Sequence, residues 1–165
     1  MASLSVDAAS PDEARVQLRA CCGSRRWVDR MLQRRPFGNL EQLLAAAREV
    51  WFALDPADWK EAFAAHPRIG DRASLRNRFP ETAHLAAREQ AGVDGAADDV
   101  LSALAEGNLA YERRFGFIFI VCARGLTAEQ MLEMLQARLN NDPATELLIA
   151  AEEQAKITAL RLTKS

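Results

Sequence analysis

The first side chain that could do chemistry is His66, which directly precedes a proline. Pro67 has no amide hydrogen and disfavours the α conformation in the residue before it, so we expect a helix over the preceding residues to end here. The dipole of that helix would favour a protonated imidazole at its C-terminus. Such a group can transfer a proton or bind an anion. The alternative is a capping or partly buried structural histidine.

A second candidate is Glu89 with Gln90, in the segment 86–90. A glutamate can act as a general acid or base, and a glutamine can form paired hydrogen bonds to an amide or urea group. The run Arg-Glu-Gln is equally typical of a solvated helix surface. Its spacing alone therefore does not identify a site.

The third candidate is Arg161, which stands between Leu160 and Leu162 near the C-terminal end. The planar guanidinium of an arginine can bind a carboxylate with two hydrogen bonds. The same side chain could instead extend along apolar surface and keep its charge in water.

Metal ligation is not predicted. The sequence has two histidines, His66 and His84, and three cysteines, and none of them has the spacing of a metal site or a disulfide framework. There is also no phosphate-binding glycine loop and no nucleophile elbow. Cys122 lies in an apolar run and is predicted to be a buried small hydrophobic residue.

Most segments that would position these residues begin with helix N-cap signals. Prolines at positions 11, 56 and 143 follow Ser or Asp, and Asn39 and Thr127 each have a glutamine three residues later. Residues 147–162 also show apolar side chains every three to four positions. We predict helices over 11–22, 25–34, 40–53, 56–65, 128–140 and 143–163.

The segment from Phe115 to Ala123 is ambiguous, because its composition also suits a buried strand. A strand needs partners, and no other stretch alternates convincingly. We therefore predict that it is the buried end of a long helix that starts near Asp98. The longest stretch without helix signals runs from His66 to about Ala83, and a loop of this length is often functional.

The predicted fold is one all-α domain over residues 1–165, with about eight helices and a flexible N-terminus over 1–9. Acidic and basic residues nearly cancel, 23 against 21, which argues against a nucleic-acid-binding protein. No apolar run is long enough for a membrane span, and the first residues do not resemble a secretory signal. The adjacent Cys21 and Cys22 fit a reducing compartment, so we expect a cytoplasmic protein with a small-molecule or protein partner.

Taken together, these motifs resemble the 2-oxo-4-hydroxy-4-carboxy-5-ureidoimidazoline (OHCU) decarboxylase family. The resemblance runs in order from about residue 15 to residue 163, and no single motif carries it. One departure is Ala86, where the family usually has the serine of its Ser-x-x-Glu-Gln segment. The matching segments are 21–24, 26–28, 35–37, 65–70, 86–92, 108, 111, 115–120 and 156–162.

The resemblance implies an enzyme that converts OHCU to (S)-allantoin in urate degradation, as a homodimer and without a cofactor. It implies that His66 and Glu89 are the catalytic pair and that Arg161 binds an anionic or carbonyl part of the substrate. The remaining substrate contacts that it implies are Pro67, Ala86, Gln90, Phe119, Ile120, Val121, Cys122 and Ala123.

Two alternatives remain open from the sequence. One is a non-catalytic helical interaction module that docks through its His-Pro loop. The other is an enzyme of the same fold that acts on a different ureido or imidazoline compound, which the absence of the serine hydroxyl at Ala86 leaves possible.

Overall fold

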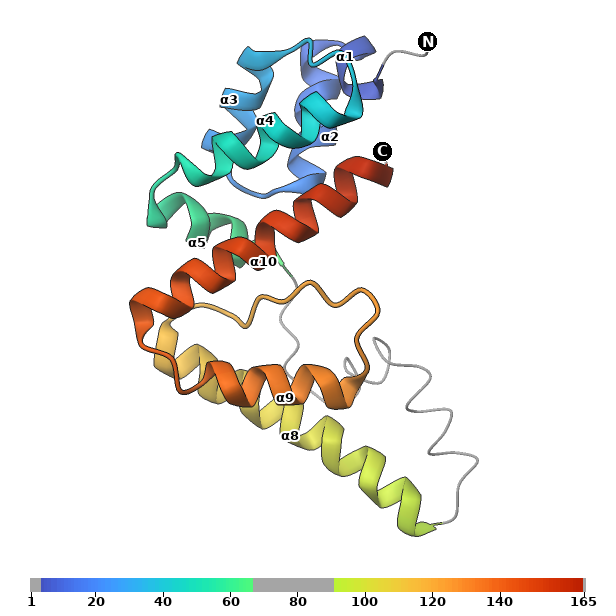
Figure 1. The fold of residues 1–165 in the computed structure, drawn as a ribbon, viewed down its shortest axis with the longest axis vertical. Coiled ribbons are helices and arrows are strands. Elements are labelled where there is room, and N and C mark those ends of the chain that lie inside the picture. Colours follow the sequence, from blue (N-terminus) through green and yellow to red (C-terminus); the bar gives the residue numbers. More distant parts are fainter. Residues whose placement is uncertain (1–3, 67–90, 165) are drawn as a thin grey trace. The chain divides into compact units, whose positions relative to one another are not determined.

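The computed structural model of the protein describes residues 4–66 and 91–164, and within them every regular element is a helix (Figure 1). This confirms the predicted all-α fold. The helices are α1 (Ser5–Ala8), α2 (Pro11–Cys21), α3 (Arg25–Arg34), α4 (Leu40–Phe52), α5 (Pro56–Ala64), α8 (Ala91–Phe115), α9 (Ala128–Arg138) and α10 (Pro143–Lys164).

Side-chain caps set the helix starts where the sequence predicts them. Ser10 accepts a hydrogen bond from the Glu13 amide at 3.2 Å. The Asn39 side chain accepts from the amide three residues later at 2.8 Å. Thr127 and Gln130 form a reciprocal capping box, with bonds of 3.1 and 2.9 Å. Each cap satisfies an amide that has no partner inside its helix, so these boundaries follow from local sequence.

One element is predicted wrongly. Helix α8 begins at Ala91 rather than near residue 98 and ends at Phe115, so the segment 116–123 is not helical. Gly116 has a φ of +81°, a left-handed conformation that ends the helix, and its amide donates to the Glu112 carbonyl at 2.9 Å. The burial was predicted correctly for four residues of the segment: Phe117, Phe119, Ile120 and Val121. Cys122 is only half-buried, contrary to prediction.

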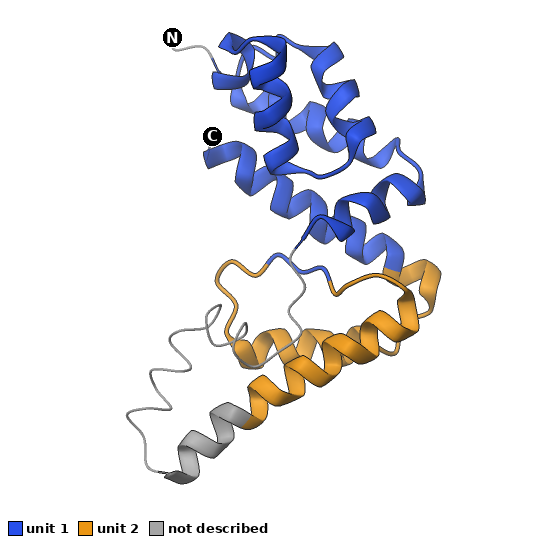
Figure 2. Ribbon diagram, turned by 180° about the vertical axis from the view of Figure 1, so that it is seen from behind, with its two compact units in different colours: residues 1–66, 120–122, 147–165 blue, residues 67–119, 123–146 orange. Residues whose placement is uncertain are grey.

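The chain forms two compact units, which Figure 2 colours separately. Unit 1 consists of residues 1–66, 120–122 and 147–165. Unit 2 consists of residues 67–119 and 123–146. None of the helices in the described part of the chain is long and apolar enough to cross a membrane.

Tryptophans hold unit 1 together, and each indole N–H finds a backbone acceptor. Trp27 donates to the Ala47 carbonyl at 3.1 Å, and Trp51 donates to the Ala151 carbonyl at 2.9 Å. The second of these bonds joins α4 to α10 across 100 positions of sequence. An ion pair between Arg48 and Glu152, at 2.7 Å, lies beside it. Helix α10 is thereby held against α4 in a fixed register.

Helix α1 is hydrogen-bonded to the segment that follows α3. Helix α1 comes from the stretch for which the sequence predicts a flexible N-terminus. Its Asp7 carboxylate accepts hydrogen bonds from the amides of Phe37 and Gly38, at 2.9 Å each. Arg35 in turn donates to the carbonyls of Val6 and Ala9.

In unit 2, α8 and α9 lie side by side and run in the same direction (Figure 1). Gly107 allows this close approach, because a Cβ atom there would lie 2.5 Å from the Leu135 side chain. One turn further along, Tyr111 of α8 lies against Arg138 of α9.

Candidate functional site

His66 lies two residues beyond the end of α5, as the His-Pro pattern predicts. Two hydrogen bonds of 3.2 Å close the last turn there: the Ala65 amide donates to the Ala62 carbonyl, and the His66 amide donates to the Phe63 carbonyl. The Phe63 ring is fully buried and anchors this last turn in the core of unit 1. The imidazole itself is half-buried, so it is held by the core without being enclosed in it.

The imidazole contacts a fully buried amide on α10. Its Nε2 lies 2.5 Å from Oε1 of Gln154, which has no exposed surface. The Gln154 Nε2 in turn donates to the Thr158 hydroxyl at 3.0 Å. Both ends of the buried amide therefore have partners, as buried polar groups generally require.

The row of polar side chains continues to Cys22, at the end of α2. Hydrogen bonding by the Ser24 backbone and the Thr158 side chain acts to lower the pKa of its thiol. Burial nevertheless dominates and raises the pKa of the Cys22 thiol to about 11. Burial also raises the pKa of Cys21. Both groups are therefore neutral thiols near pH 7, which excludes a thiolate nucleophile at either position.

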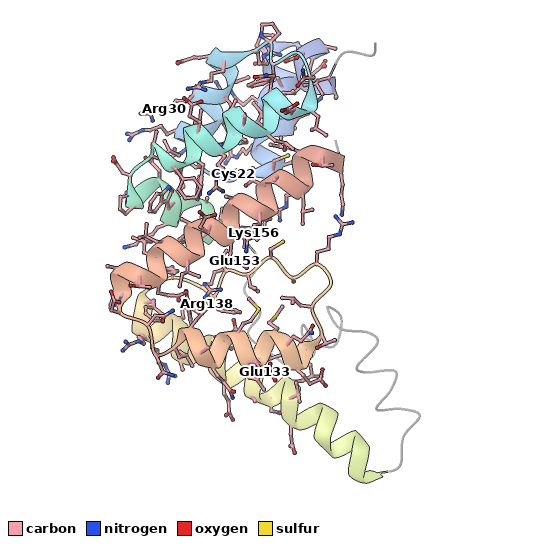
Figure 3. All side chains as sticks on the ribbon, in the orientation of Figure 1. Cys22, Arg30, Glu133, Arg138, Glu153 and Lys156 are labelled. Carbon is pink, nitrogen blue, oxygen red and sulfur yellow. The ribbon has the colours of Figure 1, made fainter. Side chains whose placement is uncertain are left out.

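The segment Ile120–Cys122 belongs to the same unit as His66. The Cys122 amide donates to the Glu153 carboxylate at 3.1 Å, and Lys156 Nζ lies 2.6 Å from the other oxygen of that carboxylate. Glu153 is almost fully buried, and its hydrogen bond raises the pKa of Lys156. Figure 3 labels Glu153 and Lys156 on the part of α10 that belongs to unit 1, and Cys22 directly after α2.

Arg161 stands on α10 seven positions after Gln154. Seven residues make about two turns, or roughly 10 Å, so the two residues share a face of the helix. The Arg161 side chain is exposed, and its guanidinium donates to the Ala20 carbonyl at 3.4 Å. Helix α10 thus carries both the partner of His66 and the predicted anion-binding arginine.

Not all predicted site residues fall within this unit. Unit 1 contains His66, Arg161 and the segment Ile120–Cys122. Phe119 and Ala123 belong to unit 2. Four predicted site residues lie outside the described part of the chain: Pro67, Ala86, Glu89 and Gln90.

The sequence analysis missed Glu153, Gln154 and Thr158. The apolar spacing of residues 147–162 indicated a helix but not which of its side chains are buried: Leu148 is 56% exposed, while Glu146 and Gln154 are fully buried. The available signal was the spacing of Gln154, Thr158 and Arg161, which are three to four residues apart and so share one face.

Unit 2 contains a second buried polar cluster, formed by Tyr111, Arg138, Asn141 and Glu146. Arg138 donates twice to the fully buried Glu146 carboxylate, at 2.8 and 2.5 Å. Asn141 donates to the other carboxylate oxygen at 3.0 Å, and the Tyr111 hydroxyl also bonds to this carboxylate. Burial, followed by the bond to Glu146, raises the pKa of Tyr111 far above its usual value. The carboxylate is thus compensated by a cation and by two neutral donors.

The Arg138 guanidinium also lies 4.6 Å from the centre of the Phe119 ring. The cluster is therefore closed by aromatic surface. Among the side chains that the structure describes, in residues 4–66 and 99–164, no three His, Cys, Asp or Glu side chains are grouped so that they could hold a metal ion.

Comparison with known proteins assigns the family. The model of the OHCU decarboxylase family matches residues 7–163. A uric acid degradation bifunctional protein of Arabidopsis thaliana is 39% identical over 147 residues, which are 88% of this chain and 45% of that protein. A 2-oxo-4-hydroxy-4-carboxy-5-ureidoimidazoline decarboxylase of Amia calva is 34% identical over 128 residues, 78% of this chain and 73% of that protein.

A solved structure agrees with this assignment. The crystal structure of an OHCU decarboxylase in the presence of (S)-allantoin superposes with a TM-score of 0.71 at 36% identity, covering 94% of this chain and 97% of that one. With the family model matching nearly the whole sequence, the chain belongs to the OHCU decarboxylase family.

Proposed function

We propose that this protein decarboxylates OHCU to (S)-allantoin and carbon dioxide. The observation that carries the proposal is the placement of His66. The imidazole is half-buried at the end of α5, and the fully buried Gln154 of α10 holds its Nε2. The family membership and the likeness to the structure with (S)-allantoin support the choice of substrate.

The chemistry of this substrate explains why no cofactor is needed. OHCU carries a carboxylate and a hydroxyl on one ring carbon, next to an imine carbon that bears the ureido group. When the carbon–carboxylate bond breaks, its electron pair forms a double bond to the neighbouring carbon, and the imine π pair moves to nitrogen, which takes up a proton. The substrate is therefore its own electron sink, a role that a cofactor plays in other decarboxylases.

Stereochemistry is decided in the following step. The enol hydroxyl loses its proton to become the carbonyl of allantoin, and the ureido-bearing carbon gains a proton on one face. We propose His66 as the group that handles these protons and Glu89 as its partner on the hydroxyl or the ring nitrogen. An imidazole can both give and take up a proton near neutral pH, which suits this step.

Substrate binding is assigned to the remaining predicted residues. Gln90 and the main chain of residues 119–123 would bind the ureido and ring edges, with Pro67 and Ala86 as further contacts. Arg161 would bind an anionic or carbonyl part of the substrate, for which its exposed guanidinium is suited. We also propose that the protein is a cytoplasmic homodimer, as the family resemblance suggests. Light scattering on the purified protein tests the dimer, and a monomer at micromolar concentration would contradict it.

The direct test of the activity is circular dichroism on freshly generated urate-oxidation product. Spontaneous decay gives racemic allantoin, so only stereospecific protonation produces an optical signal. We expect rapid growth of the (S)-allantoin signal when the protein is added. An unchanged rate with racemic product would overturn the proposal and favour an interaction module. Turnover of another ureido compound alone would favour the same-fold enzyme.

A further inference from the structure

We infer that Gln154 is a positioning residue that keeps a proton on Nε2 of His66, so that Nδ1 is the atom that exchanges protons with the substrate. This inference rests on the proposed function, because it specifies how the imidazole of that site works. It concerns a residue of α10 that lies 88 positions from the histidine in sequence.

The contact between His66 and Gln154 has a defined donor and acceptor. Oε1 of Gln154 lies 2.5 Å from Nε2 of His66. An amide oxygen can only accept a hydrogen bond, so the ring nitrogen facing it must carry the hydrogen. Gln154 has no exposed surface, so bulk water does not compete for this oxygen.

The contact at the other end of the amide agrees with this orientation. The Gln154 Nε2 donates to Thr158 Oγ1 at 3.0 Å. The amide N–H group therefore faces the hydroxyl oxygen, and the amide oxygen faces the imidazole.

The hydrogen bonds therefore run in one direction, from His66 through Gln154 to Thr158. Thr158 is 5% exposed, so this direction is set inside the core of unit 1. A neutral His66 then has its lone pair on Nδ1, and a protonated His66 has its exchangeable acid there as well. The hydrogen bond made by one ring nitrogen in this way selects the role of the other.

The test is nitrogen-15 NMR on histidine-labelled protein, in which the variant His84→Asn assigns the His66 signals. We expect a pyrrole-type Nε2 with an exchange-protected proton and a pyridine-type Nδ1 in the neutral state. A proton on Nδ1 with a bare Nε2 would overturn the inference. This measurement needs no turnover, so it is independent of whether the proposed reaction is correct.

Variants add an activity readout. Gln154→Met removes the acceptor at similar volume, and we expect the protected Nε2 proton to disappear and kcat to fall roughly 10-fold or more. Gln154→Glu keeps an acceptor oxygen and should restore both the protected signal and much of kcat. The matched control is Gln136→Met, at an exposed position of α9, which should change neither. Full kcat in Gln154→Met would contradict the inference.

Discussion

The two buried polar clusters described above, one in each unit, differ in whether they reach the surface. In unit 2, the carboxylate of Glu146 has an arginine, a tyrosine and an asparagine as partners, and Arg138 and Tyr111 are themselves buried. In unit 1, the row of hydrogen bonds joins the buried side chains of Thr158 and Gln154 and ends at the half-buried imidazole of His66.

The difference indicates different roles. The cluster of unit 2 joins α8, α9 and the start of α10 by hydrogen bonds to one charged group. Removing a member leaves buried charge less well compensated, which destabilises the fold. A row of neutral groups that ends at a partly exposed titratable ring orients that ring instead. Changes in the cluster of unit 2 should therefore reduce stability, and changes at the end of the row in unit 1 should reduce turnover.

The largest effect on stability is expected for Glu146→Ala. It removes the carboxylate that accepts two hydrogen bonds from the buried Arg138 cation, and breaking such a buried pair typically costs about 3–5 kcal/mol in the free energy of unfolding. The matched control is Glu49→Ala, which breaks the exposed pair with Arg34 at 2.9 Å and should cost less than about 1 kcal/mol. Urea unfolding measures both. Equal losses in the two variants would contradict the role given to the closed cluster.

A smaller loss of stability is expected for Tyr111→Phe. The variant removes one hydrogen bond to a charged acceptor and keeps the ring, so we expect a loss of about 1–3 kcal/mol. Turnover per folded molecule should stay within roughly twofold, because Tyr111 is assigned no part in proton transfer, in substrate binding or in the orientation of His66. A large fall in kcat without a loss of stability would indicate that Tyr111 contributes to catalysis.

Alkaline pH should destabilise unit 1 through Cys22. Its pKa is raised to about 11 in the folded protein, so the folded state holds this proton more tightly than the unfolded chain does. The resulting stability is fully present below about pH 8.5, the usual pKa of a cysteine, and is lost as the pH rises toward 11. Cys22→Ala should reduce the slope of unfolding free energy against pH above pH 9 by up to about 1.4 kcal/mol per pH unit. An unchanged slope would contradict the assignment.

No change in rate is expected when metal ions are removed. The substrate accepts its own electron pair, so turnover should survive exhaustive chelation, and the purified protein should show no absorbance from a pyridoxal group. Loss of turnover that a metal ion restores would refute a cofactor-free mechanism.

Local signals account for what the sequence predicted well. The six helices predicted from caps and prolines agree with the structure within two residues at each end. A cap forms between residues only three positions apart, so it depends little on the rest of the fold. The end of α5 before His66 is set by Pro67 in the same local way.

Long-range contacts account for what the sequence analysis missed. The stretch after Phe115 is apolar enough for a helix, but Gly116 adopts a left-handed φ, and the amide of Cys122 finds its acceptor on α10. Gln154 and Thr158 have the composition of a solvated helix face. Their spacing places them on one face of α10, but it does not show that this face is buried against the end of α5.

The measurement that tests the central claim most directly is the stereospecific turnover of His66→Asn. Asparagine keeps polarity and some hydrogen bonding but cannot transfer the proton, a contribution typically worth about 10²–10⁴-fold. We predict a melting temperature close to that of the wild type and a loss of at least roughly a hundredfold in kcat. The rate is measured by circular dichroism of the allantoin formed. If the variant does not fold, Glu89→Gln serves in its place, with the same expected loss. A folded His66→Asn protein that makes (S)-allantoin at nearly the wild-type rate would contradict the account.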